Sequence, residues 1–240
     1  MNILNVRIDN LSQKETLEWI ARAVKKKTPC QIITANPEIL IEARRNPAFF
    51  EILNQSDLNV PDGAGLLFAA KFSGQKLKER VTGVDLVKKL AKEKFSLFFL
   101  GGRENRAKES VKVLVRDNPN LKIAGIDSGG EAGERGEVKK EVLEKIKKAK
   151  PDILLVAFGA PKQEFFISQY KKELNVPVAI GVGGAFDFIS GKMPRAPLWL
   201  RQMGLEWLFR LFIQPKRWKR IYAAVIKFPL TVIYERIKLK

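Results

Sequence analysis

The feature of this sequence that most constrains its fold is a series of short apolar runs that do not alternate with polar residues. They are "CQIITA", "SLFFLGG", "DILLVAFGA" and "VPVAIGVGG", and amphipathic stretches separate them along the chain. A strand that is apolar at every position is buried on both faces, which requires a layer of helices on each side. We therefore predict an α/β fold with a mostly parallel sheet flanked by helices.

The stretches between these runs show the apolar spacing of helices. Pro37 suits a first helical turn, whereas Pro47 lies in the middle of its stretch and should interrupt the helix. Shorter strands are expected at residues 4–9 and 121–130, the second ending in a turn. Helices are expected at residues 11–27, 36–56 with a break near Pro47, 104–119, 133–151 and 162–174.

The alternation of strands and helices stops near Pro194. Residues 195–240 mix Trp, Phe and Leu with eleven Lys and Arg but two Glu. This composition is typical of helices that lie in the interface of an anionic membrane, and it also suits single-stranded nucleic acid. The plain alternative is a helical subdomain with a solvated basic face. We predict a core domain at residues 1–194 and a membrane-associating helical appendage at 195–240, with completion of the active site as its further role.

Composition removes several classes of chemistry. The chain has no histidine and one cysteine, Cys30, so His-based triads, His-containing zinc sites, thiolate metal clusters and internal disulfides are excluded. Any acid-base catalysis must therefore use Asp, Glu, Lys, Tyr or Cys. A net charge of +18 favours an anionic partner: nucleic acid, anionic lipid or a phosphorylated substrate. The N-terminus lacks the order of a secretory signal, and no segment has the ~20 apolar residues of a spanning helix, so a cytoplasmic location is expected.

Unusual residues follow the ends of four predicted strands. Because carboxyl ends of parallel strands meet at one edge of a sheet, these loops should converge on one composite site. The candidates are Thr34, Asn36, Asp62, Gly63, Gly159, Pro161, Lys162, Gln163, Glu164, Gly181, Gly183 and Asp187. Each also has a plainer interpretation, as a helix cap, a turn or a first-turn acid. Asp62 is attractive as a general base because histidine is missing and the preceding "LNV" is apolar enough to be buried.

The glycine-rich loops fail the tests for two common cofactor sites. "GVGGAF" has Phe186 where a dinucleotide fingerprint needs Gly or Ala, and no Gly-Lys-Ser/Thr sequence exists for an NTPase loop. An NAD enzyme and an NTPase are therefore disfavoured. The chain also lacks an Asp-x-Asp pair, which disfavours a metal-dependent sugar-nucleotide site, although a single carboxylate could still hold magnesium.

Several longer motifs occur in a fixed order. They are "TANPEIL", "PDGAGLLFAAKFSG", "ERVTGVDL", "FFLGG", "PDILLVAFGAPKQEFFI", "GVGGAFDFISGKMPRAP" and "GLEWLFRLFIQPKRWKRIY". Together they resemble the WecG/TagA/CpsF family of bacterial glycosyltransferases, from about Ile3 to Tyr222. The resemblance implies a Rossmann-like core, a membrane-associating C-terminal appendage, and inverting transfer of a sugar from a UDP donor to a polyprenyl-diphosphate-linked sugar.

The resemblance also implies roles for individual residues. It places the base on Asp62, a catalytic neighbour on Thr34 and a substrate contact on Asn36. The loops from Gly159 to Glu164 and from Gly181 to Asp187 would face the nucleotide, with Gln163 as its expected contact. Arginines that would close over the diphosphate are Arg210, Arg217 and Arg220.

The implied donor is UDP-N-acetylmannosamine, with its uronic acid or UDP-glucose as alternatives, and the acceptor is N-acetylglucosamine on undecaprenyl diphosphate, as in teichoic acid linkage. We expect no metal cofactor, a peripheral position on the inner face of the cell membrane and no nucleic-acid partner. A basic nucleic-acid-binding protein is the alternative from another class. The sequence leaves the oligomeric state open.

Overall fold

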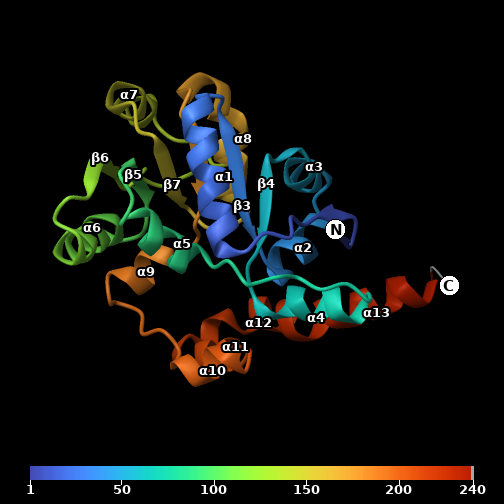
Figure 1. Cartoon of the computed structure of the whole chain (residues 1–240). Helices are drawn as coiled ribbons and strands as arrows, with labels where there is room; N and C mark the ends of the chain where they lie inside the picture. Colours follow the sequence, from blue (N-terminus) through green and yellow to red (C-terminus); the bar gives the residue numbers. More distant parts are fainter. Residues whose placement is uncertain (239–240) are drawn as a thin grey trace.

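The centre of the protein is a six-stranded sheet in which all neighbouring strands are parallel. The computed structural model describes residues 1–238, and Figure 1 shows the sheet surrounded by helices. The strand order is β4-β3-β8-β7-β5-β6. The strands are β3 (Cys30–Ala35), β4 (Leu58–Pro61), β5 (Ser96–Gly101), β6 (Lys122–Asp127), β7 (Ile153–Ala157) and β8 (Val178–Gly181). The predicted α/β fold is confirmed.

Successive residues of the central strands explain the apolar runs. Ile32 belongs to the core on one face of the sheet and Ile33 to the core on the other, and both are fully buried. The same holds for Leu155 and Leu154. One face is covered by α1 (Gln13–Lys26), α5 (Gly83–Leu90), α6 (Arg106–Asp117) and α9 (Ala185–Ile189). The other is covered by α2 (Pro37–Ala43), α3 (Pro47–Gln55), α7 (Lys140–Ala149) and α8 (Lys162–Leu174), and α4 (Ala64–Phe72) joins the same core from the end of the sheet.

Local signals account for most element boundaries. Ser12 and Glu15 form a capping box at the start of α1, and Asn46 caps α3 with Pro47 at its first turn, which produces the predicted break.

The extents of two predicted elements were wrong. Helix α7 begins at Lys140 instead of Gly133, because Gly136 at φ +75° belongs to a loop that packs on Phe166. Residues 4–9 provide only β2 (Val6–Arg7), which pairs with β1 (Asn2–Ile3) outside the main sheet.

The C-terminal segment is helical, as predicted, but it is broken into short pieces. They are α10 (Leu198–Gln202), α11 (Glu206–Ile213), a 3₁₀ turn η1 (Pro215–Arg217), α12 (Trp218–Tyr222), a π turn η2 (Ala223–Lys227) and α13 (Phe228–Lys238). Phe228 is fully buried in the core beside α2 and α4, and Glu235 pairs with Arg44. In Figure 1 these pieces run along one end of the molecule next to α4. Within residues 1–238, no helix is long and apolar enough to cross a membrane.

Candidate functional site

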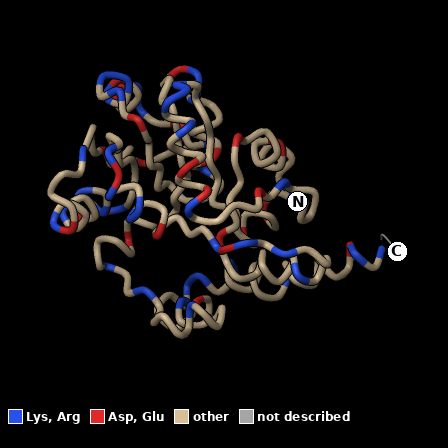
Figure 2. The backbone as a smooth tube through the Cα atoms, in the orientation of Figure 1, with Lys and Arg blue, Asp and Glu red and all other residues tan. Residues whose placement is uncertain are grey.

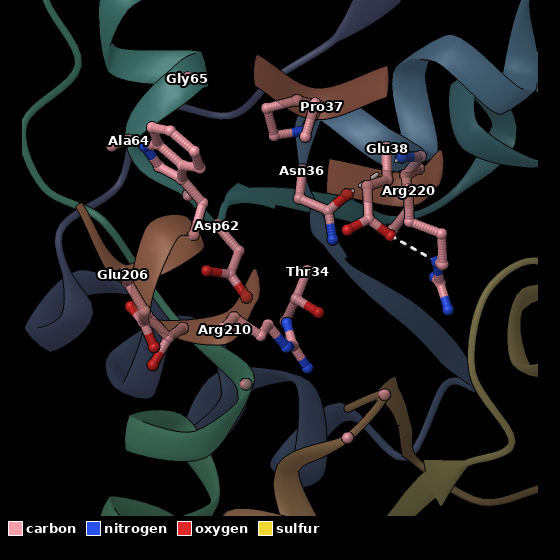
Figure 3. A pocket seen from close by; sticks show the side chains of 18 of the residues that line it. Thr34, Asn36, Pro37, Glu38, Asp62, Ala64, Gly65, Glu206, Arg210 and Arg220 are labelled. Carbon is pink, nitrogen blue, oxygen red and sulfur yellow. Dashed lines mark hydrogen bonds and ion pairs between the residues drawn. The ribbon is translucent and has the colours of Figure 1, made fainter. Parts of the chain in front are cut away.

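A cavity of about 530 Å³ lies where the carboxyl ends of the sheet strands meet the C-terminal helices. It brings together most of the residues that the sequence singles out, from both the core and the tail. These are Thr34, Asn36, Asp62, Gly63, Gly159, Gln163, Gly183, Arg210, Arg217 and Arg220. Figure 3 shows Thr34, Asp62 and Arg210 directed into the same space.

The ends of β3 and β4 supply the polar floor of this cavity. Thr34 donates a hydrogen bond from Oγ1 to the Gly181 carbonyl at 2.9 Å, which joins β3 to β8. Asn36 is the N-cap of α2, and its Oδ1 accepts from the Ile39 amide at 3.0 Å. The capping interpretation of Asn36 therefore holds, and the residue lines the cavity as well.

Asp62 follows β4 directly and is held by a backbone hydrogen bond from its amide to the Ala35 carbonyl, at 2.6 Å. Burial raises the pKa of its carboxyl group to about 6, and the nearby Glu206 adds to the rise. Arg80, Arg210 and a hydrogen bond from the Gly83 amide act in the opposite direction. The group is therefore ionised at neutral pH but basic enough to take up a proton, as a general base must.

Gln163 fastens two glycine loops to each other. Its Oε1 accepts from the amides of Gly159 and Gly183, at 3.1 and 2.9 Å, and its Nε2 donates to Glu164 Oε1 at 2.7 Å. Only 2% of Gln163 is exposed. Gln163 lines the cavity, but its polar atoms bind the loops that follow β7 and β8. It therefore positions the backbone of these loops, in addition to any contact with a ligand.

The five other predicted residues lie outside the cavity lining. Glu164 is fully buried behind Gln163, and Gly181 supplies the carbonyl that Thr34 contacts. Lys162 turns away and donates to the Ala132 carbonyl at 2.9 Å. Asp187 pairs with Arg106 at 3.4 Å, and Pro161 forms the N-cap of α8.

Glu164 is a buried acid that no sequence pattern distinguishes from a first-turn capping residue. Burial raises the pKa of its carboxyl group to about 7, although the hydrogen bond from Gln163 lowers it. Its Oε2 is buried without a hydrogen-bond partner among the described residues. Burial therefore shifts Glu164 toward its neutral form, relative to an exposed carboxyl group.

The three tail arginines line the same cavity as Asp62. Arg220 donates from Nε to Glu38 at 2.7 Å, whereas the buried Nε of Arg210 has no partner in the described part of the chain. Burial, together with the charges of Arg210 and Arg220, lowers the pKa of Arg217 to about 10. Three guanidinium groups that repel one another in one cavity make a strong site for an anion such as a diphosphate.

The acidic and basic residues that attach the tail at the cavity were not predicted from the sequence. Arg80 pairs with Glu206 of α11 at 3.1 Å, and both line the cavity. Arg195 holds Asp85 of α5 through two hydrogen bonds, at 2.5 and 2.7 Å. The motifs "ERVTGVDL" and "MPRAP" contain three of these residues, Arg80, Asp85 and Arg195. The motifs therefore marked these positions, but one sequence does not show which residues of distant segments pair with each other.

Comparisons with known proteins identify the family of the chain. The profile of the family described as "Glycosyl transferase WecG/TagA/CpsF family" matches residues 1–240. A relative from Bacillus spizizenii is 37% identical over 214 residues, which cover 87% of this chain and 81% of that protein. One from Staphylococcus aureus is 32% identical over 231 residues, which cover 92% and 86%. Both are named N-acetylglucosaminyldiphosphoundecaprenol N-acetyl-beta-D-mannosaminyltransferase. With its α/β core, its composite cavity and this similarity over nearly its whole length, the chain belongs to the WecG/TagA/CpsF family of glycosyltransferases.

Proposed function

We propose that this glycosyltransferase moves N-acetylmannosamine from UDP-N-acetylmannosamine to N-acetylglucosamine carried on undecaprenyl diphosphate. The names of the relatives describe this acceptor and this transferred sugar. The observation that carries the proposal is the cavity itself, where the Asp62 carboxylate shares the lining with the tail arginines Arg210, Arg217 and Arg220. A sugar transfer between two diphosphate-linked substrates needs a base and cations in one place.

The chemistry assigned to Asp62 is removal of a proton from the acceptor hydroxyl. As the hydroxyl oxygen forms its bond to the anomeric carbon of the donor sugar, the bond from that carbon to the UDP oxygen breaks, and the configuration inverts. The proton passes to the Asp62 carboxylate and the electron pair leaves with UDP. Arg210 lies close enough to Asp62 to lower the pKa of its carboxyl group, so base and cation act across a short gap. Thr34 would contact the acceptor beside Asp62.

The negative charge in this reaction is carried by two diphosphates. Arg210, Arg217 and Arg220 supply cations from the tail, while Asn36, Gly63, Gly159 and Gly183 line the same cavity and shape the space for the donor. We propose that these groups replace a metal ion. Activity that persists in excess EDTA is the expected result, and full dependence on an added divalent ion would contradict it.

The proposal includes a peripheral position on an anionic membrane surface, since the acceptor is a membrane lipid. Large apolar side chains are exposed along the tail, among them Trp199, Phe212 and Trp218 at 58%, 79% and 56%. Figure 2 shows Lys and Arg distributed along the same helices. Exposed aromatic groups beside basic groups are what an interfacial helix requires.

A panel of UDP-sugars tests the proposed reaction. The protein is incubated with UDP-N-acetylmannosamine, its uronic acid or UDP-glucose, together with N-acetylglucosamine linked through diphosphate to a lipid, and the products are identified by mass spectrometry. Transfer of N-acetylmannosamine is expected. Transfer of one of the other two sugars instead would assign a different donor. No transfer, with strongly salt-dependent binding of RNA or DNA, would overturn the proposal.

A further inference from the structure

One side of the cavity is apolar and open to solvent. Phe68 of α4 and Met203, which follows α10, both line it, and they are 45% and 65% exposed. Trp207, Val225 and Pro229 continue the apolar lining toward the tail. The lining therefore combines two kinds of chemistry, because Asp62 and the three arginines line the same cavity as these apolar side chains.

Helix α4 carries large apolar side chains on its solvent-exposed face as well as on its buried face. Its inner residues Leu66, Ala69 and Ala70 are fully buried, and a surface helix normally compensates for such a face with polar residues outside. Here the exposed residues are Phe68 and Phe72, stacked at 6.1 Å between ring centroids, with Lys71 as the one exposed polar residue beside them.

The two exposed side chains of the opening come from segments that touch. Gly204, at φ +74°, lies against the first turn of α4, and a Cβ atom there would come within 3.1 Å of the Ala64 Cβ. The end of α10 is thereby fixed beside the start of α4, immediately after Asp62. Met203 and Phe68 flank the opening at this junction, one from the tail and one from the core.

We propose that this opening is the binding site for the isoprenoid chain of the acceptor, with the first isoprene units lying on Phe68 of α4 and on Met203. The proposal rests on the function proposed above, which supplies the acceptor's diphosphate. With the diphosphate on the arginines, the attached chain must leave the cavity, and the apolar side offers an exit lined by hydrocarbon.

Continuity with the polar site identifies the occupant as the acceptor's own chain instead of bulk membrane lipid. Phe68 lines the same cavity as Arg210 and Arg217, whereas Phe212 and Trp218 are exposed on the tail outside the cavity lining. A membrane surface would contact the exposed aromatic groups of the tail whether or not they line the cavity. A chain anchored by its diphosphate would contact those next to the arginines first.

Two soluble ligands that share a headgroup test this site without a membrane. Farnesyl diphosphate and isopentenyl diphosphate carry the same headgroup and differ mainly in chain length, with one double bond shifted, and calorimetric titration of the full-length protein gives their affinities. The wild-type protein should bind farnesyl diphosphate more tightly by on the order of tenfold, because the longer chain buries apolar surface. Phe68→Ser should reduce this preference to about twofold or less and leave the affinity for isopentenyl diphosphate unchanged.

Phe212→Ser is the matched control, since it removes the same side chain from an exposed position outside the cavity, and it should retain the preference for the longer chain. Met203→Ser tests the other flank on a separate element, should Phe68→Ser fail to fold. Equal affinity of the wild type for both ligands would overturn the proposal, and so would an unchanged preference in both the Phe68 and Met203 variants. Failure of sugar transfer with this preference intact would instead contradict the proposed function.

Discussion

Asp62 shows how position makes an ordinary turn residue reactive. In the sequence it is the Asp of an Asp-Gly pair, but the structure places it at the end of a buried strand and at the edge of a cavity. Burial raises the pKa of its carboxyl group to about 6. Since this group must be ionised to accept a proton, kcat/KM is expected to fall as the pH drops below about 6.

Replacing Asp62 by Asn should separate activity from stability. Turnover is expected to fall by at least about a hundredfold, because the base is lost. The raised pKa means that ionised Asp62 destabilises the folded state above pH 6, so Asp62→Asn should increase the free energy of unfolding at pH 7.5 by about 1–3 kcal/mol. Urea denaturation checks this gain, which should shrink as the pH falls toward 4. Turnover within a few-fold of wild type would show that Asp62 is not the base.

Glu164 is expected to act by holding Gln163 in place. Glu164→Gln keeps an oxygen that accepts from Gln163 Nε2, whereas Glu164→Leu removes it and frees the amide that fastens both glycine loops. The Leu variant should raise the KM for the UDP-sugar about tenfold, the equivalent of one lost hydrogen bond, with a smaller change in kcat. The Gln variant should stay near wild type. Equal kinetics in the two variants would rule out this role.

Lys162 and Glu164 show where residue-level prediction fails. Both follow the same strand end as Gly159 and Gln163, so their place in the sequence predicts the same site. The side chains of the first turn of α8 point in different directions, however. Lys162 reaches the loop before α7, and Glu164 points into the core, so neither lines the cavity. The end of a strand can be predicted from one sequence. The angle at which the next helix leaves the strand, and so the direction of its side chains, depends on packing.

At the scale of elements, the strands and helices of the core were largely predictable. Residues buried on both faces make β3, β5, β7 and β8 visible as apolar runs, and Pro47 marks its helix boundary. The tail was predictable as helical but not in its breaks or its docking. Its attachment depends on Phe228 and on ion pairs with Arg44, Arg80 and Glu38, which join segments far apart in the sequence.

The Asp85–Arg195 pair should stabilise the junction between α5 and the segment that leads into the tail. Although burial raises the pKa of Asp85, hydrogen bonds from Arg195 and Thr82 lower it to about 2. Arg195→Ala is expected to cost about 1–2 kcal/mol of unfolding free energy at pH 7, allowing for solvent screening at this partly exposed pair. Because the pKa of Asp85 is lowered, this difference should vanish as the pH falls toward 2. A difference that persists at acid pH would mean that Arg195 acts through packing.

At the scale of the whole molecule, the tail and α7 lie at opposite ends, which makes the proposed membrane orientation testable (Figure 1). Lys219 is exposed on α12 beside Trp218, and Lys148 is exposed on α7. Lys219→Glu should weaken sedimentation with anionic vesicles about tenfold, at roughly 1 kcal/mol for each unit of charge near the surface. Lys148→Glu changes the net charge equally and should have little effect. Equal losses would indicate attraction to net charge without an orientation.

The tail cannot be tested by simply removing it. Deleting the chain after Pro194 would also remove Phe228 from the core and Glu206 from Arg80, so lost activity would not distinguish anchoring from unfolding. Point substitutions in the intact chain avoid this problem. They can be assayed with an acceptor whose short chain keeps it in solution, so that membrane binding plays no part.

The role of the tail in the active site is therefore tested most directly by transfer from UDP-N-acetylmannosamine to such a soluble acceptor, catalysed by the Arg217→Gln variant. If the tail completes the active site, kcat/KM should fall by about a hundredfold, as when a charge-stabilising group is lost. Lys216→Gln, which changes an exposed neighbour by the same charge outside the cavity lining, should remain within about twofold of wild type. Wild-type activity in Arg217→Gln would contradict the account and reduce the tail to an anchor.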